Sequence, residues 1–287
     1  MKKKVIKEQI LQELLESLYP DSSGRTLKNM LREKRVAIDG SVVTHGKHLV
    51  REGQEVVVGR APAPSIQEFE VLYEDPYLII IDKPEGLLSV PLDKGPAKNA
   101  FDLLRDYYRN TELFAVHRID RDTSGVIVYA RTREAKKGMD ELFKSHDLMR
   151  EYVALLEGHV ASPKGSWQSH LIEKSHFEVR ATENEGEGRL AITHYDVIRT
   201  TAKCTWVHLV LETGRKHQIR VHCRDAGHVV VGDKQYGSTM NPYRRLCLHA
   251  HRIAFTHPIT GQKVDVQAKP VDFIKGLEKL FENIGKE

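Results

Sequence analysis

The stretch that decides the fold is residues 116–131, which read VHRIDRDTSGVIVYAR. Its first half is polar and its second half is β-branched and aromatic, so it predicts a loop that turns at Gly125 and enters a buried strand. Beside that strand the loop places ionisable side chains: His117, Arg118, Asp120, Arg121 and Asp122. Loops held by a rigid scaffold commonly carry catalytic groups. We therefore expect this loop to line a cleft with a chemical function.

The composition favours a soluble, compact protein. The chain has 287 residues, of which 40% are hydrophobic, enough for one sizeable core and a second small domain. No apolar run is long enough to cross a bilayer, and no signal-type apolar region follows the basic start. Cys204, Cys223 and Cys247 are too few for a disulfide framework and are expected to be core thiols. We expect a cytoplasmic protein with no membrane partner.

The excess of positive charge lies near the N-terminus. Residues 1–60 hold 12 Lys and Arg against 8 Asp and Glu, whereas the remaining 227 residues hold 32 of each sign. Attraction to a polyanion from the larger part of the chain must therefore come from local patches. The basic segment is a candidate for binding an acidic polymer.

Residues 1–60 are predicted to form a small α/β module. Apolar residues at helical spacing from Ile6 to Leu18 predict a first helix that ends at Pro20, and a second helix should follow Gly24. Asp39-Gly40 predicts a tight hairpin turn between two strands. The second helix and its end carry basic side chains: Lys28, Arg32, Lys34 and Arg35. Prolines in the following residues, 61–68, predict a linker to a larger domain at 69–287.

Four separated blocks resemble the RNA pseudouridine synthases, which isomerise uridine in ribosomal and transfer RNA. Residues 117–125 match the signature His-Arg-Leu-Asp-x-x-Thr-Ser-Gly, with Ile119 in place of Leu. Residues 78–86 resemble an apolar strand followed by Asn-Lys-Pro-x-Gly, although Asp82 stands where Asn is common. The other two blocks are a Lys-x-Tyr-x-Ala strand and Thr-Gly-Arg-x-His-Gln-Ile-Arg-x-His, matched at 150–158 and 213–222. Together with shorter matches, the resemblance covers residues 70–258.

The resemblance implies a fold and a set of site residues. The expected fold class is α+β: a mixed, mostly antiparallel sheet flanked by helices, with a central catalytic cleft. Asp120 would be the catalytic carboxylate, kept ionised by Arg220. It would either attack the ribose C1′ or remove a sugar proton, and the sequence leaves both routes open. Tyr152 would stack on the uracil and serve in proton transfer, and Arg118 would fill the space left by the flipped nucleotide.

Residues 1–60 also resemble the S4 RNA-binding module. By that resemblance Lys28, Arg32, Lys34 and Arg35 would face RNA phosphates. RNA is then the expected partner, with large-subunit ribosomal RNA favoured over transfer RNA. We expect a monomer without a metal or cofactor, because the sequence has no His-Glu-x-x-His pair, Walker loop or dinucleotide fingerprint.

Three other interpretations are open. For an isolated Asp120, a local salt bridge with Arg118 or Arg121 would be the ordinary role. The chain could also be a non-catalytic S4-type RNA-binding protein, although the Asp, Tyr and Arg positions of the motif are all filled. A glycosidase would need a second carboxylate, for which Asp122 is the nearby choice.

Overall fold

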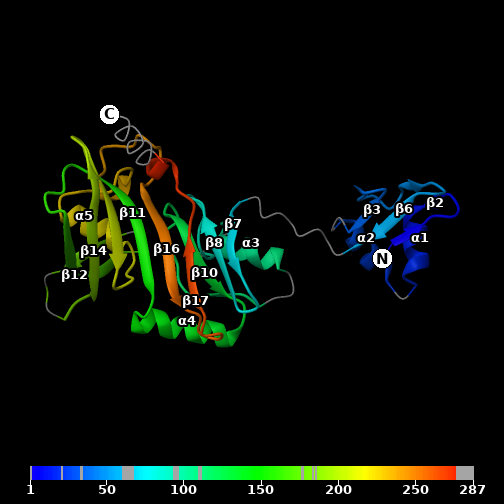
Figure 1. Cartoon of the computed structure of the whole chain (residues 1–287), viewed down its shortest axis with the longest axis horizontal. Helices are drawn as coiled ribbons and strands as arrows, with labels where there is room; N and C mark the ends of the chain where they lie inside the picture. Colours follow the sequence, from blue (N-terminus) through cyan, green and yellow to red (C-terminus); the bar gives the residue numbers. More distant parts are fainter. Residues whose placement is uncertain are drawn as a thin grey trace. The chain divides into compact units, whose positions relative to one another are not determined.

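The computed structural model describes residues 2–20, 22–32, 35–59, 68–92, 97–108, 112–175, 178–182, 184 and 186–275. The chain divides into two compact units, Met1–Ser65 and Ile66–Glu287 (Figure 1). Apart from its last residue, the predicted linker at 61–68 lies outside the described residues. In the described part of the chain, no helix is both long and apolar enough to span a membrane.

The first unit packs two helices on short strands. In chain order these are β1 (Lys2–Lys4), β2 (Gln9–Ile10), α1 (Leu11–Leu18), α2 (Gly24–Arg32), β3 (Val36–Ile38), β4 (Ser41–Val42), β5 (Leu49–Val50) and β6 (Glu55–Val58). The strands form a sheet of order β1-β6-β3-β4 and a separate pair, β2-β5. The predicted hairpin turn is confirmed, since Asp39 and Gly40 have positive φ angles of 49° and 82°.

The first helix is shorter than its apolar spacing predicts. The prediction that it starts near Ile6 is wrong: Ile6 is 82% exposed, and Ile10 pairs with Leu49 in the β2–β5 ladder. Pairing of β2 with β5 uses backbone groups that a longer helix would need. Only the later positions of the stripe, Leu11, Leu14 and Leu15, are buried.

The second unit is built on one large sheet. Its main strand order is β13-β12-β14-β15-β11-β16-β10-β8-β7, with β17 beside β16 and β9 beside β10. The elements are β7 (Glu70–Glu74), β8 (Leu78–Lys83), α3 (Ala100–Tyr107), β9 (Phe114–Ala115), β10 (Ser124–Ala130), α4 (Arg133–Ser145), β11 (Met149–Glu157), β12 (Lys164–Ser175), β13 (Glu178–Thr182), β14 (Arg189–Thr200), β15 (Cys204–Leu211), α5 (Gln218–Asp225), the 3₁₀ turn η1 (Lys234–Tyr236), β16 (Leu248–Thr256) and β17 (Lys263–Gln267). Among the described strands of this sheet, β10 and β16 form the one parallel pair. The predicted α+β class with a mostly antiparallel sheet is confirmed.

Residues of α4 and α3 pack on side chains of β8 and β10, and the apolar runs 78–81 and 126–130 of these strands are fully buried. Both helices are labelled near these strands in Figure 1. Leu78 and Ile80 pack in the cluster that includes residues of α4, whereas Ile79 and Ile81 pack in the cluster that includes residues of α3. Alternate side chains of one strand therefore lie in different cores. The strand is thus fixed between two packed layers, and the loops at its ends have a rigid support.

Gly125 has a role other than the predicted turn. It lies inside β10, opposite Ala250 of the parallel strand β16. A Cβ atom at Gly125 would lie 2.1 Å from the carbonyl oxygen of Ala250, and the residue has a φ of 111°. Glycine is needed here because two backbones approach closely, not because the chain reverses.

The first residues of helix α5 are buried. His217 precedes it in the left-handed region at φ 53°, and Gln218 starts the helix. The Gln218 Oε1 accepts hydrogen bonds from Thr213 Oγ1 and from the backbone N–H of Arg215. All side chains from Gln218 to Cys223 are buried, so the polar side of this helix faces protein. The three cysteines are buried and free, as predicted.

Candidate active site

His117 fixes the start of the loop 117–124 to the sheet. Its Nε2 accepts a hydrogen bond of 2.9 Å from the backbone N–H of Val128 in β10. The imidazole is therefore neutral, with its proton on Nδ1. Burial, followed by the charge of Arg150, lowers the pKa of His117 to about 3. The ring also packs on Phe143 of α4, with centroids 4.7 Å apart.

We predict that His117→Phe keeps this ring packing but destabilises the fold by about 1–3 kcal/mol at pH 7, because it leaves a buried N–H without an acceptor. The difference in unfolding free energy between wild type and variant should be smaller by about 2 kcal/mol at pH 5. The folded pKa lies below the unfolded value, so the wild type loses stability as pH falls from 6.5 toward 3, and the variant lacks this loss. Denaturant unfolding at both pH values measures this, with exposed His159→Phe as the control. A difference in stability between variant and wild type that stays constant or widens at pH 5 would contradict a neutral, partly buried His117.

Ser89 and Ile119 fix the middle of the loop. The Ser89 hydroxyl donates to the carbonyl of Ile119 at 2.7 Å and accepts from its N–H at 3.2 Å. Ile119 is 6% exposed and packs with Ile127 and Ala250. A side chain pointing into the core at 119 directs its neighbours, Arg118 and Asp120, away from that core.

Lys83 fixes the later part of the loop, at Arg121. It is fully buried, and its Nζ donates to the carbonyls of Pro84, Leu87 and Arg121 at 2.9, 2.7 and 3.0 Å. These three acceptors match the three N–H donors of an ammonium group. Burial lowers the pKa of Lys83 to about 7, against the raising effect of Asp120 and Asp122. Lys83 thus holds the backbone of the loop at Arg121, the residue next to Asp120.

Asp120 lies between these anchors and contacts α5. Its Oδ2 accepts a hydrogen bond of 3.1 Å from Arg220 Nη1 and lies 3.7 Å from Nε2 of His217. Its side chain is 23% exposed, so it is both supported and accessible. Arg121 pairs instead with Asp122, at 3.0 Å and in solvent. Asp120 thus pairs with residues of the α5 region, about a hundred positions away in the chain, whereas its neighbour Arg121 pairs with Asp122.

Arg220 is held from two sides. Burial opposes its charge, but hydrogen bonding to Asp233 and the charges of Asp233 and Asp120 raise the pKa of Arg220 above its ordinary value. The guanidinium is therefore a permanent cation beside the Asp120 carboxylate.

Tyr152 lies on β11 between two packed clusters, one containing α5 residues and one containing α3 residues. Burial raises the pKa of its hydroxyl to about 12, with Arg150 lowering and Asp120 raising it. Tyr152 is therefore a neutral phenol near neutral pH, and Asp120 is close enough to act on its charge.

The remaining predicted residues are placed as follows. Arg118 is exposed on the same loop as Asp120. In the first unit, Lys28 is exposed on α2. Arg35 donates from Nε to the carbonyl of Gly59 at 3.2 Å, so part of its guanidinium is bound to the backbone of the same unit. Arg32 is the last residue of α2, and Lys34 lies outside the described residues.

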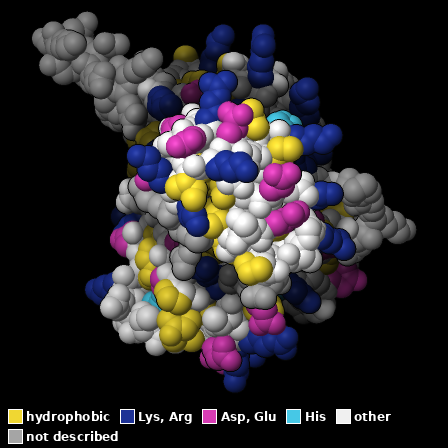
Figure 2. Space-filling model, turned by 90° about the vertical axis from the view of Figure 1, so that its right-hand side faces the viewer, with side chains coloured by type: hydrophobic (Ala, Val, Ile, Leu, Met, Phe, Trp, Pro, Cys, Tyr) yellow, Lys and Arg dark blue, Asp and Glu magenta, His cyan; other side chains and the backbone are white. Residues whose placement is uncertain are grey.

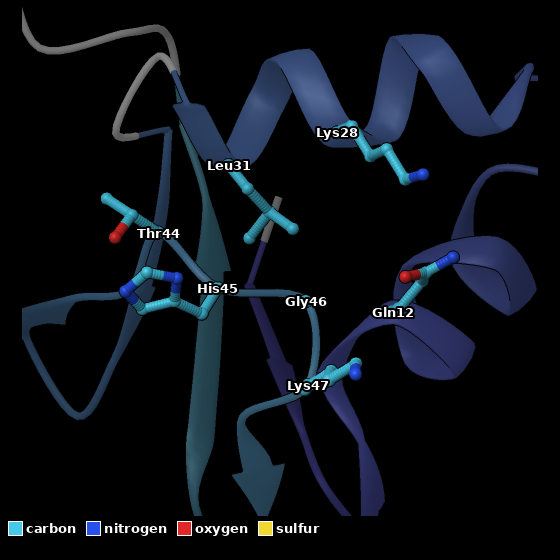
Figure 3. Close-up of a pocket in the computed structure, with 7 residues that line it drawn as sticks. All are labelled: Gln12, Lys28, Leu31, Thr44, His45, Gly46 and Lys47. Atoms are coloured by element: carbon cyan, nitrogen blue, oxygen red, sulfur yellow. The ribbon is translucent and has the colours of Figure 1, made fainter.

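A hollow of about 430 Å³ lies beside Lys28. Figure 3 shows the side chains of Lys28 on α2, of Lys47 in the loop that precedes β5, and of Gln12 on α1 around this hollow. Its lining consists of Gln12, Lys28, Leu31, Thr44, His45, Gly46 and Lys47. The basic side chain of Lys47 was not among the predicted RNA contacts, because it stands outside the basic helix in the sequence.

The histidines do not form a metal site in the described part of the chain, where no group of three or more possible ligands occurs. His222 instead hydrogen bonds with Thr193 Oγ1 at 2.9 Å and with Ser169 Oγ at 3.0 Å. Both ring nitrogens of His222 are thus engaged in the protein.

Comparison with known proteins gives a consistent result. Residues 77–225 match the family described as RNA pseudouridylate synthase. The chain is 33% identical over 273 residues to the uncharacterized RNA pseudouridine synthase YhcT of Bacillus subtilis (strain 168), covering 91% of this chain and 89% of that protein. It is 30% identical over 300 residues to ribosomal large subunit pseudouridine synthase D of Escherichia coli (strain K12), covering 95% of this chain and 90% of that protein. The structure of human RNA Pseudouridylate Synthase Domain Containing 1 superposes with a TM-score of 0.61 at 25% identity, covering 75% of this chain and 89% of the human one.

Proposed function

The chain belongs to the RNA pseudouridylate synthase family, and on that premise we propose that it isomerises uridine in RNA with Asp120 as the reacting carboxylate. The family and the enzyme class predicted from the sequence are thereby confirmed. The observation that supports the role of Asp120 is its position: an anchored loop presents it, partly exposed, to the guanidinium of Arg220 at 3.1 Å.

Isomerisation requires three events at one nucleotide. The N1–C1′ bond breaks, the uracil turns while it is held, and C5 bonds to C1′ with loss of the C5 proton. Asp120 can begin this sequence by attacking C1′ or by removing a sugar proton, and both routes need an ionised carboxylate. Arg220 supplies a fixed positive charge that favours this form.

Tyr152 is proposed to bind the uracil, and Arg118 to fill the space that the nucleotide leaves. Tyr152 presents an aromatic ring near Asp120, suited to stacking on uracil. Its neutral hydroxyl can exchange a proton near C5. Arg118 extends into solvent from the same loop, where it can fill the space that the flipped nucleotide leaves.

Large-subunit ribosomal RNA is the proposed substrate, with transfer RNA as the alternative. The name of the Escherichia coli relative, which aligns over 95% of this chain, supports the first. The test is to incubate the protein with separate transcripts of both RNAs and map pseudouridine in each. Pseudouridine in transfer RNA alone would select the alternative.

We propose that the first unit binds phosphates of the same RNA as an S4-like module. Its exposed side chains include the basic residues Lys28 and Lys47. On the face of the protein that Figure 2 displays, Lys and Arg lie among acidic and apolar side chains. Phosphate contacts are therefore expected at local clusters, and Lys28 and Lys47 at one hollow form such a cluster.

The double variant Lys28→Ala with Lys47→Ala should weaken RNA binding and reduce the slope of log K against log salt by about 1.5, because each lost phosphate contact removes about 0.7–0.9. The single-turnover rate at saturating RNA should stay within about twofold, since the chemistry lies in the other unit. Lys7→Ala, an exposed lysine of the same unit outside the hollow, is the control. An unchanged salt slope would remove this hollow from the RNA-binding surface.

A further inference from the structure

The guanidinium of Arg220 is held at more points than its contact with Asp120 requires. Nε donates to Asp233 Oδ2 at 2.6 Å, and Nη2 donates to Asp233 Oδ1 and to Gln235 Oε1, both at 2.8 Å. Two parallel N–H bonds to one carboxylate make a strong and geometrically specific pair. The side chains of Arg220 and Asp233 are only 9% and 2% exposed. Nη1 is the nitrogen left to face Asp120.

Asp233 is itself fixed by a short turn. Gly232 has a φ of 83°, and a Cβ atom there would lie 1.8 Å from the carbonyl oxygen of Arg245. The Asp233 N–H donates to the carbonyl of Val230 at 3.0 Å, and its carboxylate accepts from the N–H of Tyr236 at 3.3 Å. The carboxylate therefore cannot follow a guanidinium that moves.

Tyr236 closes another side of the site. Its ring centroid lies 4.8 Å from Cζ of Arg220, and its hydroxyl hydrogen bonds with Nδ1 of His217 at 2.8 Å. Nε2 of His217 is the second group near Asp120, at 3.7 Å. Residues 232–236 thus contact both side chains that flank the reacting carboxylate.

The charge of Asp120 is lost in either route. If it attacks C1′, it becomes an ester while the N1–C1′ electron pair leaves with uracil. If it removes a sugar proton, it becomes a neutral acid while the same electron pair leaves. Without Asp233, Arg220 would then be a buried cation with no carboxylate partner, which is strongly unfavourable. The carboxylate of Asp233 is not consumed, so it can stay paired with Arg220 throughout.

We propose that Asp233, assisted by Gln235, is a positioning residue of the isomerisation. It sets the orientation of Arg220 so that only Nη1 reaches Asp120, and it balances the charge of Arg220 when Asp120 is no longer ionised. This inference rests on the proposed role of Asp120.

The test is a double-mutant cycle on the full chain, measured as single-turnover pseudouridine formation followed for many hours so that slow variants remain measurable. Asp233→Asn, which keeps the shape and removes the charge, should slow the reaction at least about 100-fold while the RNA Kd changes less than about twofold. In the background of Arg220→Met the same substitution should have no further effect, because the residue through which it acts is gone. An equal fold loss in both backgrounds would make Asp233 merely structural and overturn the proposal, as would wild-type turnover by Asp233→Asn.

Two further variants keep the outcome clear. If Asp233→Asn does not fold, Gln235→Met replaces it at the exposed end of the turn, with an expected loss of about tenfold that likewise vanishes without Arg220; an unchanged rate would overturn the proposal. Asp120→Asn is measured in parallel. If that variant still forms pseudouridine, the proposed role of Asp120 is wrong and this inference fails with it. If it is inactive, the double-mutant cycle tests the role of Asp233 separately.

Discussion

Asp120→Asn is expected to lower the single-turnover rate of pseudouridine formation by at least about 10⁴-fold, a loss typical of removing a reacting group. An amide can neither bond to C1′ as a carboxylate does nor take up a sugar proton. The fold and the RNA Kd should change little, because the backbone is held by His117, Ser89 and Lys83, and the amide oxygen can still accept from Arg220.

Asp122→Asn is the matched control. It lies two residues away on the same loop, is exposed, and pairs with Arg121. Its activity should stay within about twofold of wild type. The reverse pattern, with activity lost at Asp122 and kept at Asp120, would contradict the proposed site and favour a different carboxylate.

Arg220→Met should have the second largest effect, on both rate and stability. It leaves the buried carboxylate of Asp233 without its cation, which should cost about 3–5 kcal/mol of unfolding free energy. It also removes the charge beside Asp120, so the single-turnover rate should fall by at least about 100-fold. Denaturant unfolding and the RNA assay measure the two losses separately.

Arg224→Met is the control for this change. Arg224 lies one turn along the same helix, pairs with the adjacent Asp225 and, like Arg220, packs its guanidinium on the ring of Tyr236. Its loss should cost less than about 1 kcal/mol and leave the rate near wild type. Equal losses for the two arginines would mean that Arg220 acts only through helix packing.

Local patterns predicted most of the fold. The two-sided burial of β8 and β10 follows from their unbroken apolar runs, and the hairpin at Asp39-Gly40 follows from its turn residues. Patterns failed where a distant strand competes for the same backbone. Ile6 and Ile10 have helical spacing, but pairing of Gln9 and Ile10 with β5 sets the start of α1 at Leu11.

The site was predictable only in part. The family motif pointed to Asp120 and Arg220, but their contact depends on the order β15-β11-β16-β10, which joins residues a hundred positions apart. Spacing gave no reason to connect Lys83 with the carbonyl of Arg121, or Asp233 with Arg220. These residues act through tertiary hydrogen bonds, which leave no periodic signal in the sequence.

The most direct measurement of the central claim follows the hydrogen on C5 of uridine. Large-subunit ribosomal RNA transcribed with C5-tritiated uridine is incubated with the full chain, and tritiated water and free uracil are both quantified. Forming the C5–C1′ bond releases the C5 hydrogen but keeps the base attached. Wild type should release tritium, Asp120→Asn should release none, and neither should release free uracil. Label in free uracil would indicate a glycosidase instead, and no tritium release from ribosomal or transfer RNA would contradict the account.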